Sequence, residues 1–400
     1  MTETNSARWT ALDALRGAAV AGMILVTSPG DWNAAYPQLR HADWNGWTVT
    51  DMVFPIFLFS VGAALALSFP RPLANREARS QLWWRIGRRA LALIALGLVL
   101  NWLAELAIAV WVHDPGSGTL GHVRIPGILQ RIALCYLLGA GLILATARKD
   151  SAGRAEIDAR AIGVAIVVIL LGYWALMTLV PVPGYGAGYL DPAGNLAAYI
   201  DRAIFTPPHM WRFSTPVWGG VAIYDPEGLL STLPATANLL FGVLAAREWQ
   251  RSPDRAVSRI ALAGLALFVA GLLLDPLFVI NKRIWTSSFA LLSSGFAAMT
   301  LAGLALVLRG PATRLLAPLR VLGGNAILAF VLSQLLGTIG GLPLIGAGGG
   351  RIPPQKWGNQ VALSVISEPH LASLACAVVI LAVITLAIWP LHRRAIHFRL

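Results

Sequence analysis

The chain has little charge and almost no cysteine. Asp, Glu, Lys and Arg together make up 12% of its 400 residues, whereas 56% are hydrophobic and the mean hydropathy is +0.66. This composition excludes the two or three soluble domains that such a length would otherwise suggest. No stretch between the apolar runs is long enough for a separate soluble domain, and we find no internal repeat with a period of about 20–50 residues.

Several common catalytic and nucleotide-binding motifs are absent as well. The sequence contains no Walker-type loop, no GxGxxG after a strand, no G-x-S-x-G and no HExxH. Its only cysteines, Cys135 and Cys376, lie inside apolar runs, so we interpret them as small buried hydrophobes and not as a disulfide or a metal site. His41 with Asp43 is a poor match to a zinc site, and we expect no metal.

Apolar runs near twenty residues long recur along the whole chain, and this is the length that a helix needs to cross a bilayer. The polar N-terminus lacks a cleavable signal pattern, so we expect the first run to be retained. We predict an all-α integral membrane protein, a bundle of about ten transmembrane helices forming a single domain over residues 1–400. The expected spans are approximately 9–29, 48–69, 88–111, 127–147, 161–180, 229–247, 259–275, 286–308, 321–343 and 367–389.

The net charge of +12 is explained by topology. When the connections between the spans are assigned alternately to the two sides, 21 of the 31 Lys and Arg residues fall on one side and eight on the other. Such a bias in short loops marks the cytoplasmic side, so both termini are expected there. The basic balance therefore requires no nucleic acid partner.

The stretch His41–Pro55, HADWNGWTVTDMVFP, joins the first two spans and concentrates polar chemistry beside a membrane boundary. By the charge bias, His41 lies on the non-cytoplasmic side. A histidine near its ordinary pKa can act as a general base or as a nucleophile without a metal, and Asp43 or Asp51 can orient it. Outer-loop histidines are also common without any catalytic role, and the residue types alone do not decide between these interpretations.

Charged residues also lie inside the spans, where they are rare and face the protein interior. Asp13 and Arg16 share one helical face, either as an ion pair that fixes this helix or as a wall of a polar tunnel. Asn101 and Glu105 lie in the third span, and Arg131 in the fourth is the expected partner of Glu105.

An arginine cluster opens the third span. Arg85, Arg88 and Arg89 follow two tryptophans and can serve topology and lipid headgroup contact, or they can hold the phosphates of a cytoplasmic ligand.

Residues 181–228 form the one long outer segment, which we interpret as a cap of loops and short helices over the outer mouth. Asp225 followed by Pro226 predicts a helix N-cap with proline at the first helical position. Asp225 and Glu227 would face the same mouth as His41.

Several of these motifs together resemble a known family. The run LDALRG, then MILV, then HADWNGWTVTDMVFPIFLFSVG is similar to the signature of the heparan-α-glucosaminide N-acetyltransferase family and its bacterial relatives. The similarity continues through RIPGILQRIALCY, YDPEGLLSTLPA, NKRIWTSSFALL and LGGNAILAF, and so spans nearly the whole chain in order.

The resemblance implies a transmembrane acyltransferase that takes an acetyl group from cytoplasmic acetyl-CoA and passes it to an amino sugar on the far side. The family's active-site histidine, in a His-Ala-x-Trp-Asn-Gly motif, falls on His41. The lysosomal member has an asparagine at the end of the first span, where this sequence has Thr27, a shorter hydrogen-bonding side chain.

Three groups of candidate site residues follow. The catalytic candidates are His41, Asp51 and Asp43. The candidates for binding acetyl-CoA are Thr27, Arg16, Asp13, Arg85, Arg88, Arg89, Gln130 and Arg131. The candidates for binding the sugar are Trp44, Asn45, Asp225 and Glu227. A tunnel lined by Asp13, Arg16, Asn101, Glu105, Gln130 and Arg131 would let the thioester reach across the hydrocarbon core.

The expected partners are a sugar or glycan acceptor and membrane lipid, in a bacterial inner membrane, and a homodimer is left open. One alternative function is an O-acetyltransferase of a cell-envelope glycan with the same architecture. Another is a small-molecule transporter, for which no inverted repeat or paired broken helices are found.

Overall fold

The computed structural model describes residues 3–69, 79–112, 120–149, 155–215, 220–347 and 350–398. This part of the chain is almost entirely helical, which confirms the predicted all-α class. Its long helices are α1 (Glu3–Thr27), α2 (Val49–Ser68), α4 (Arg79–Val112), α5 (Ile128–Thr146), α6 (Ala159–Leu179), α8 (Thr232–Arg251), α9 (Ala256–Leu273), α10 (Ser287–Val307) and α14 (Pro369–Arg393). Its shorter elements are α7 (Leu196–Phe205), α11 (Ala317–Gly324), α12 (Ala326–Gly341), α13 (Pro354–Leu363) and two antiparallel hairpins, β1 (Arg148–Lys149) with β2 (Ala155–Glu156) and β3 (Ile345–Ala347) with β4 (Gly350–Ile352).

Eight of the described helices are long and apolar enough to cross a membrane, namely α1, α2, α4, α5, α6, α9, α10 and α14. They coincide with eight of the ten predicted spans. The predicted span 321–343 is not one helix, because α11 and α12 meet at an 80° bend. The predicted span 229–247 corresponds to α8, which contains more polar residues than the other long helices. Several of these polar side chains, such as Thr236 and Asn238, are buried inside the bundle.

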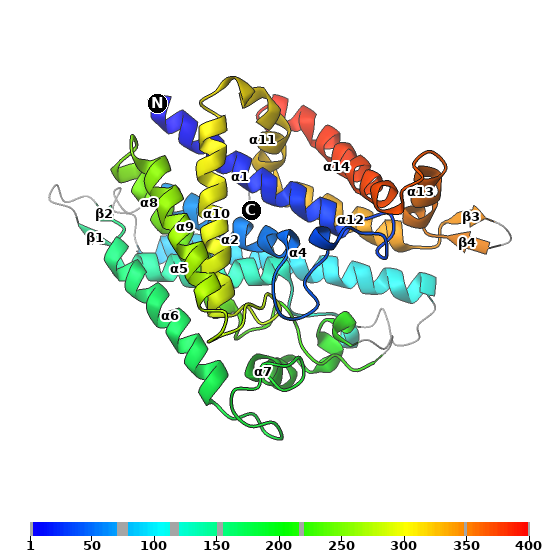
Figure 1. Cartoon of the computed structure of the whole chain (residues 1–400), viewed down its shortest axis with the longest axis horizontal. Coiled ribbons are helices and arrows are strands. Elements are labelled where there is room, and N and C mark those ends of the chain that lie inside the picture. The colour runs from blue at the N-terminus through cyan, green and yellow to red at the C-terminus, as the bar shows by residue number, and fades with distance from the viewer. Residues whose placement is uncertain are drawn as a thin grey trace.

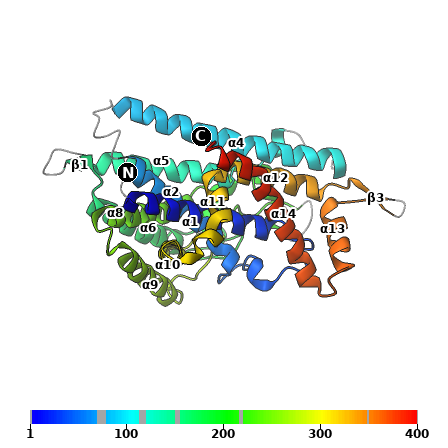
Figure 2. The same ribbon diagram turned by 90° about the horizontal axis from the view of Figure 1, so that it is seen from above.

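The ends of the helices separate into two groups (Figure 1). The N-terminus and the β1–β2 hairpin lie at the upper left of this view, whereas α7, α13 and the β3–β4 hairpin lie at the lower and right edges. In Figure 2, α4 runs along one edge of the molecule and α9 lies at the opposite edge, with α1, α2 and α8 between them. This arrangement is consistent with a bundle whose loops alternate between two faces.

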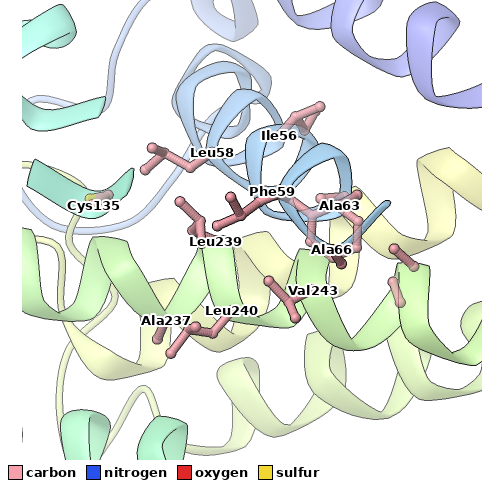
Figure 3. Packing of buried hydrophobic residues seen from close by; sticks show 14 of the residues in the cluster. Ile56, Leu58, Phe59, Ala63, Ala66, Cys135, Ala237, Leu239, Leu240 and Val243 are labelled. Atoms are coloured by element: carbon pink, nitrogen blue, oxygen red, sulfur yellow. The ribbon is translucent and has the colours of Figure 1, made fainter. Parts of the chain in front are cut away.

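The centre of the bundle is the contact between α2 and α8 (Figure 3). Phe59 and Ala63 of α2 pack against Leu239 and Val243 of α8, all at most 2% exposed. The helices touch backbone to backbone, since a Cβ at Gly62 would lie 1.8 Å from the Leu239 carbonyl oxygen. Small residues permit this close approach between membrane helices, where packing replaces the hydrophobic effect as the driving force.

The segment that begins at residue 181, which we interpreted as a cap, is anchored to the bundle. It contains α7 and short turns, and a separate apolar cluster joins it to α6 and to the connection between α9 and α10. Tyr173 of α6 and Ile284 of that connection are both at most 2% exposed, and the Tyr173 hydroxyl donates a hydrogen bond to the Ile284 carbonyl at 2.5 Å. The cap and residues 278–284 therefore form one packed outer layer beside the loop that carries His41.

Candidate active site

His41 lies in the loop that joins α1 to α2, and its ring contacts the first turn of α2. Its Nδ1 is 2.6 Å from Oδ1 of Asp51; the His41 side chain is 37% exposed and that of Asp51 is 1% exposed. When Nδ1–H donates to this carboxylate, the lone pair of the neutral imidazole is on Nε2. The structure thus brings two of the predicted catalytic residues together and leaves the second ring nitrogen available for chemistry.

Asp51 is itself held in place by the start of α2. Its Oδ2 accepts hydrogen bonds from the backbone N–H groups of Ala42 at 3.2 Å and Thr48 at 2.9 Å, and from the Thr48 hydroxyl at 3.1 Å. Thr48 and Asp51 form a capping box, a pattern that satisfies backbone N–H groups at a helix start. The carboxylate therefore has a fixed position, and the imidazole that contacts it is oriented by the helix.

The rest of the motif is pinned to the outer layer. The backbone N–H of Gly46 donates to the Ile280 carbonyl at 2.8 Å, and the Asn281 side chain donates to the Asn45 side chain at 3.2 Å. Gly46 has a φ of +91°, a conformation that residues with a Cβ rarely adopt. The indole of Trp44 donates to the Leu190 carbonyl at 3.0 Å. The loop of His41 is thereby fixed between the cap and the segment before α10.

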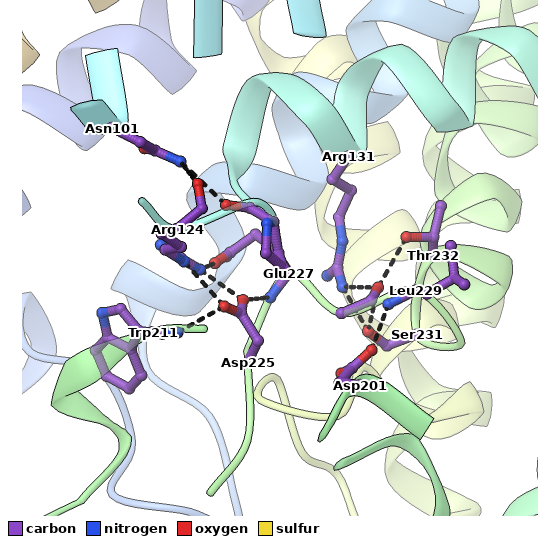
Figure 4. A network of polar contacts seen from close by, with 12 residues as sticks. Asn101, Arg124, Arg131, Asp201, Trp211, Asp225, Glu227, Leu229, Ser231 and Thr232 are labelled. Carbon is purple, nitrogen blue, oxygen red and sulfur yellow. Dashed lines mark hydrogen bonds and ion pairs between the residues drawn. The ribbon is translucent and has the colours of Figure 1, made fainter. Parts of the chain in front are cut away.

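A buried ion cluster lies behind this loop (Figure 4). Nε and Nη2 of Arg124 donate to the two oxygens of Asp225 at 2.9 and 2.6 Å, and Nη2 also contacts Glu227. Asp225 accepts further bonds from the backbone N–H groups of Trp211 and Glu227. Lys282 Nζ is 4.0 Å from Glu227 Oε1. Asp225, Glu227 and Lys282 are each at most 8% exposed, so these charges depend on one another and not on water.

Arg131 forms a second buried contact next to this cluster. At 1% exposure it donates to the Gly228 carbonyl and to Ser231, and its guanidinium lies 5.1 Å from the ring of Trp285. The Trp285 indole in turn donates to Asn238 at 2.8 Å. This chain of contacts links α5, the residues just before α8, α8 itself and the segment before α10. Figure 4 shows Arg131 with Ser231.

The charges around His41 determine its protonation. Burial and the positive charge of Lys282 lower the pKa of His41 below its ordinary value, although the hydrogen bond to Asp51 acts in the opposite direction. Burial likewise lowers the pKa of Lys282, to about 8, with Glu227 opposing it. His41 is therefore mainly neutral at pH 7, the form in which Nε2 can accept a proton or attack a carbonyl carbon.

Known proteins are similar to the part of the chain that carries these residues. Residues 8–179 match the family described as heparan-alpha-glucosaminide N-acetyltransferase, catalytic, and this region includes both His41 and Asp51. This part of the chain is similar to that catalytic family. It is 28% identical over 323 residues to the human heparan-alpha-glucosaminide N-acetyltransferase and 28% identical over 319 residues to the mouse protein of the same name. Each alignment covers 72% of this chain and 47% of the relative, so the chain spans about half the length of these relatives.

The four residues that we expected to bind the sugar come from the loop of His41 and from the segment before α8. Trp44 packs edge-on against Tyr224 of the cap with ring centroids 5.0 Å apart, and Asn45 is exposed. Asp225 and Glu227 are instead buried against Arg124. Asn45 is therefore accessible to a ligand and Trp44 is half-buried beside the cap, whereas the carboxylates of Asp225 and Glu227 are occupied by cations of the protein.

The residues predicted to bind acetyl-CoA lie in separate parts of the structure. Arg85, Arg88 and Arg89 are exposed on the first turns of α4, and Arg89 lies over the ring of Tyr136 at 4.9 Å. Gln130 is 7% exposed near the start of α5, and its Nε2 has no hydrogen-bond partner in the described part of the chain. Thr27 is exposed at the end of α1 and donates to the Met23 carbonyl at 2.8 Å.

Asp13 and Arg16 form the ion pair expected from their spacing, at 3.2 Å. Arg16 also donates to the Gly323 carbonyl of α11 at 3.3 Å, and a Cβ at Gly323 would lie 1.8 Å from the Asp13 carbonyl oxygen. These contacts support the interpretation that the pair fixes α1 against its neighbour. Asp13 and Arg16 lie between α1 and α11, whereas Asn101 and Arg131 lie on α4 and α5. The ion pair therefore does not connect these residues into the predicted tunnel.

Three expectations were wrong. Glu105 is paired with Arg212 at 3.3 Å and not with Arg131, because the outer end of α4 reaches the cap while Arg131 is held by Gly228. Asp225 does not cap a helix, since α8 begins only at Thr232 and the carboxylate is engaged by Arg124 and two backbone N–H groups. Asp43 is exposed and makes no hydrogen bond or ion pair with the described residues, so Asp51 alone orients His41.

Arg124 and Lys282 are site residues that we did not select from the sequence. Each belongs to a motif quoted for the family, RIPG and NKRIW, but nothing in those stretches shows that they meet around Glu227. Their signal was a cation placed directly before a span on the same side as His41. In the described part of the chain, no group of three or more His, Cys, Asp or Glu side chains is placed to hold a metal ion.

Proposed function

We propose that the protein is a transmembrane acetyltransferase that moves an acetyl group from acetyl-CoA to the amino group of a glucosamine-like sugar at its outer face. The observation that carries this proposal is the His41–Asp51 contact within the region that matches the catalytic family. The names of the human and mouse relatives indicate N-acetyl transfer to a glucosaminide. The membrane would be a bacterial inner membrane, with both termini on the cytoplasmic side.

The chemistry assigned to His41 uses its neutral Nε2 in one of two ways. As a nucleophile, Nε2 attacks the thioester carbonyl, the C–S bond breaks and coenzyme A leaves as the thiolate. The sugar amine then attacks the acetyl group, the bond to Nε2 breaks and the amine gives up a proton to the thiolate or to water. As a general base, Nε2 removes a proton from the amine while the amine attacks the thioester directly, and that proton goes to the departing sulfur. In both, Asp51 stabilises the positive charge that develops on the ring.

The donor and acceptor lie on opposite sides in this proposal. The arginine-rich loops mark the face where coenzyme A is available, whereas His41 lies in a loop at the other end of α1. The acetyl end of the donor must therefore reach across much of a hydrocarbon core about 30 Å thick. Gln130 and Arg131 near the outer end of α5 are the polar groups closest in sequence to the ion cluster on this route.

We place the phosphates of coenzyme A at Arg85, Arg88 and Arg89. These side chains are exposed at the arginine-rich end of α4, and guanidinium groups match phosphate oxygens with two parallel hydrogen bonds. The alternative is that these arginines contact the phosphates of lipid headgroups. A direct measurement of acetyl-CoA binding distinguishes the two.

Charge reversal of this cluster is the first test. The triple variant Arg85→Glu, Arg88→Glu, Arg89→Glu should bind acetyl-CoA at least about tenfold more weakly, because three attractive charges become repulsive. Binding is measured by calorimetry on protein in detergent, with size-exclusion elution as the check that the variant inserts and folds. Reversal of Arg309 and Arg314, which lie on the same side of the membrane in another loop, is the matched control. Unchanged binding in the triple variant would remove the phosphates from this position.

The proposed reaction is tested with the wild-type protein in liposomes that contain acetyl-CoA on the arginine-rich side. We expect acetyl transfer to glucosamine-ended acceptors on the opposite side, and no transfer to sugars that carry only hydroxyl groups. Transfer to the hydroxyl-only sugars would instead identify an O-acetyltransferase. Passage of the sugar through the membrane without consumption of acetyl-CoA would identify a transporter.

A further inference from the structure

A cavity of about 530 Å³ lies beside the first part of the loop that carries His41. It is bounded by residues 30–33 just after α1, by the end of α12 and by α13. Its volume is within the range of sites that hold small organic ligands, about 300–1,000 Å³. None of its lining residues belongs to the His41–Asp51 pair or to the ion cluster of Arg124.

The cavity is lined by the side-chain types that recognise sugars. These are one indole, four amides, one carboxylate and one ammonium group, from Trp32, Asn33, Gln355, Asn359, Gln360, Asp31 and Lys356. Amides both donate and accept hydrogen bonds, as sugar hydroxyls do, and an indole offers a flat face to the C–H face of a pyranose ring. Trp32 is 54% exposed and is therefore free to contact a ligand.

One polar atom of the lining lacks a partner in the protein. Asn359 is 8% exposed, and its buried Oδ1 makes no hydrogen bond with the described residues. Gly30 leaves room for it, since a Cβ at that position would lie 2.6 Å from this oxygen. This oxygen packs against Gly30 at the wall of the cavity, and a ligand donor reaches it when the Asn359 side chain turns toward the cavity.

The walls of the cavity are held rigidly by α14 and α13. The backbone N–H of Gly30 donates to the Ser373 carbonyl at 3.0 Å, and the Ser373 hydroxyl bonds to both backbone groups of Asp31. Gln355 of α13 donates to the Pro29 carbonyl. The cavity is thus formed before any ligand arrives, and binding requires little further ordering.

We propose that this cavity is a second carbohydrate subsite, which holds a sugar unit of the glycan whose terminal amino sugar reacts at His41. The inference rests on the proposed function for the identity of that terminal sugar. Asn33 is eight residues before His41, so the two positions are at most about 29 Å apart, a span that a short oligosaccharide can bridge. Asp31 and Lys356 together leave the lining without net charge, which favours an uncharged, hydroxyl-rich ligand over a lipid phosphate.

The test compares two tryptophans that differ in one respect. Trp32 lines the cavity, whereas Trp357 is a similarly exposed tryptophan on α13, 48% exposed, that does not. We measure binding of the fully N-acetylated glucosamine trisaccharide, which has no amine to acetylate, to detergent-solubilised protein by calorimetry. Trp32→Ala should weaken this binding about tenfold, and Trp357→Ala should leave it unchanged. Asn359→Leu should weaken it as well, because it removes the amide at nearly constant volume.

Activity supplies an independent readout. Trp32→Ala should lower the ratio of kcat/KM for a glucosamine-ended trisaccharide to kcat/KM for free glucosamine about tenfold, through KM, while Trp357→Ala keeps the wild-type ratio. Equal loss of trisaccharide binding in both tryptophan variants, or in neither, would overturn the subsite. If no amino sugar is acetylated but trisaccharide binding still depends on Trp32, the subsite stands and the proposed reaction fails.

Discussion

Replacement of His41 by alanine is expected to lower acetyl transfer to glucosamine by about 10²–10⁴-fold, the range typical of a removed acid–base or nucleophilic group. The side chain is 37% exposed and its only described hydrogen bond is to Asp51, so its loss leaves no apolar cavity in the bundle. The variant should therefore fold and elute as the wild type does. Transfer of radiolabelled acetyl groups to glucosamine is the measurement.

A matched control is available at His370. The side chain of this histidine is 44% exposed and is also paired with a carboxylate, Glu368 at 2.8 Å, but it lies at the start of α14. His370→Ala should retain wild-type transfer. Loss of activity in both variants, or wild-type activity in His41→Ala, would show that the reaction does not depend on the His41–Asp51 pair.

The His41→Ala variant separates the two mechanisms. If Nε2 is the nucleophile, wild-type protein mixed with labelled acetyl-CoA and no acceptor retains label that His41→Ala does not.

The activity of the wild-type protein is expected to depend on pH, because either mechanism requires the neutral ring of His41. Because burial and Lys282 lower the pKa of His41, wild-type activity should persist below pH 6.5, the ordinary value for histidine, and fall as the pH drops through that lowered pKa.

Replacement of Arg124 by methionine is expected to destabilise the fold by about 3–5 kcal/mol, the usual result when one partner of a buried ion pair is removed. Arg124 is the cation that both Asp225 and Glu227 contact directly, and these carboxylates are at most 6% exposed. Burial raises the pKa of Glu227, but Arg124 and Lys282 outweigh this and hold the pKa below its ordinary value. Without Arg124 the remaining charges are left in a site with little access to water.

Thermal unfolding in detergent, followed by size-exclusion elution, measures this effect. Arg259→Met is the matched control, since it removes an arginine–glutamate pair at 2.8 Å in which Arg259 is 49% exposed, and exposed pairs contribute only about 0–1 kcal/mol. Adding Asp225→Asn and Glu227→Gln to Arg124→Met should recover part of the stability, because the uncompensated charges are then neutralised. An Arg124→Met protein that unfolds together with the wild type would contradict the proposed role of the ion cluster.

The ion cluster also explains why the loop of His41 is positioned so firmly. Lys282 follows Asn281, whose side chain bonds to Asn45 in the His41 loop, and Lys282 itself lies next to Glu227. The cations before α5 and α10 and the carboxylates before α8 are thus one unit. A change at Arg124 would then reach His41 through the segment before α10.

The positions of the membrane helices could be predicted from the sequence, because a run of about twenty apolar residues has few other stable structures in a bilayer. Eight predicted spans coincide with helices that meet this criterion. The break at Asn325 could not be predicted in the same way. Its side chain bonds to the backbone of Ile396 and Phe398 near the other end of the chain, and local apolarity contains no information about such a contact.

Some features of the candidate site could likewise be predicted from the sequence, and others could not. His41 and Asp51 are ten residues apart, and the motif that contains them was sufficient to select both from the sequence. Which of Asp43 and Asp51 contacts the ring depended on where α2 begins, because the capping box turns the Asp51 carboxylate toward the loop. The predictions for Glu105 and Asp225 were wrong because a charged residue near a membrane boundary can pair with any opposite charge that the fold brings near.

The sequence by itself determined the class of the protein, the order of its apolar segments and the histidine motif, since each depends on residues close together in the chain. The tertiary structure alone decided that Arg124, Glu227 and Lys282 meet, across more than 100 residues between the first two. It also decided that residues 30–33 and α13 enclose a cavity. Contacts of this kind arise from the packing of distant helices and loops, which short-range patterns of polarity do not specify.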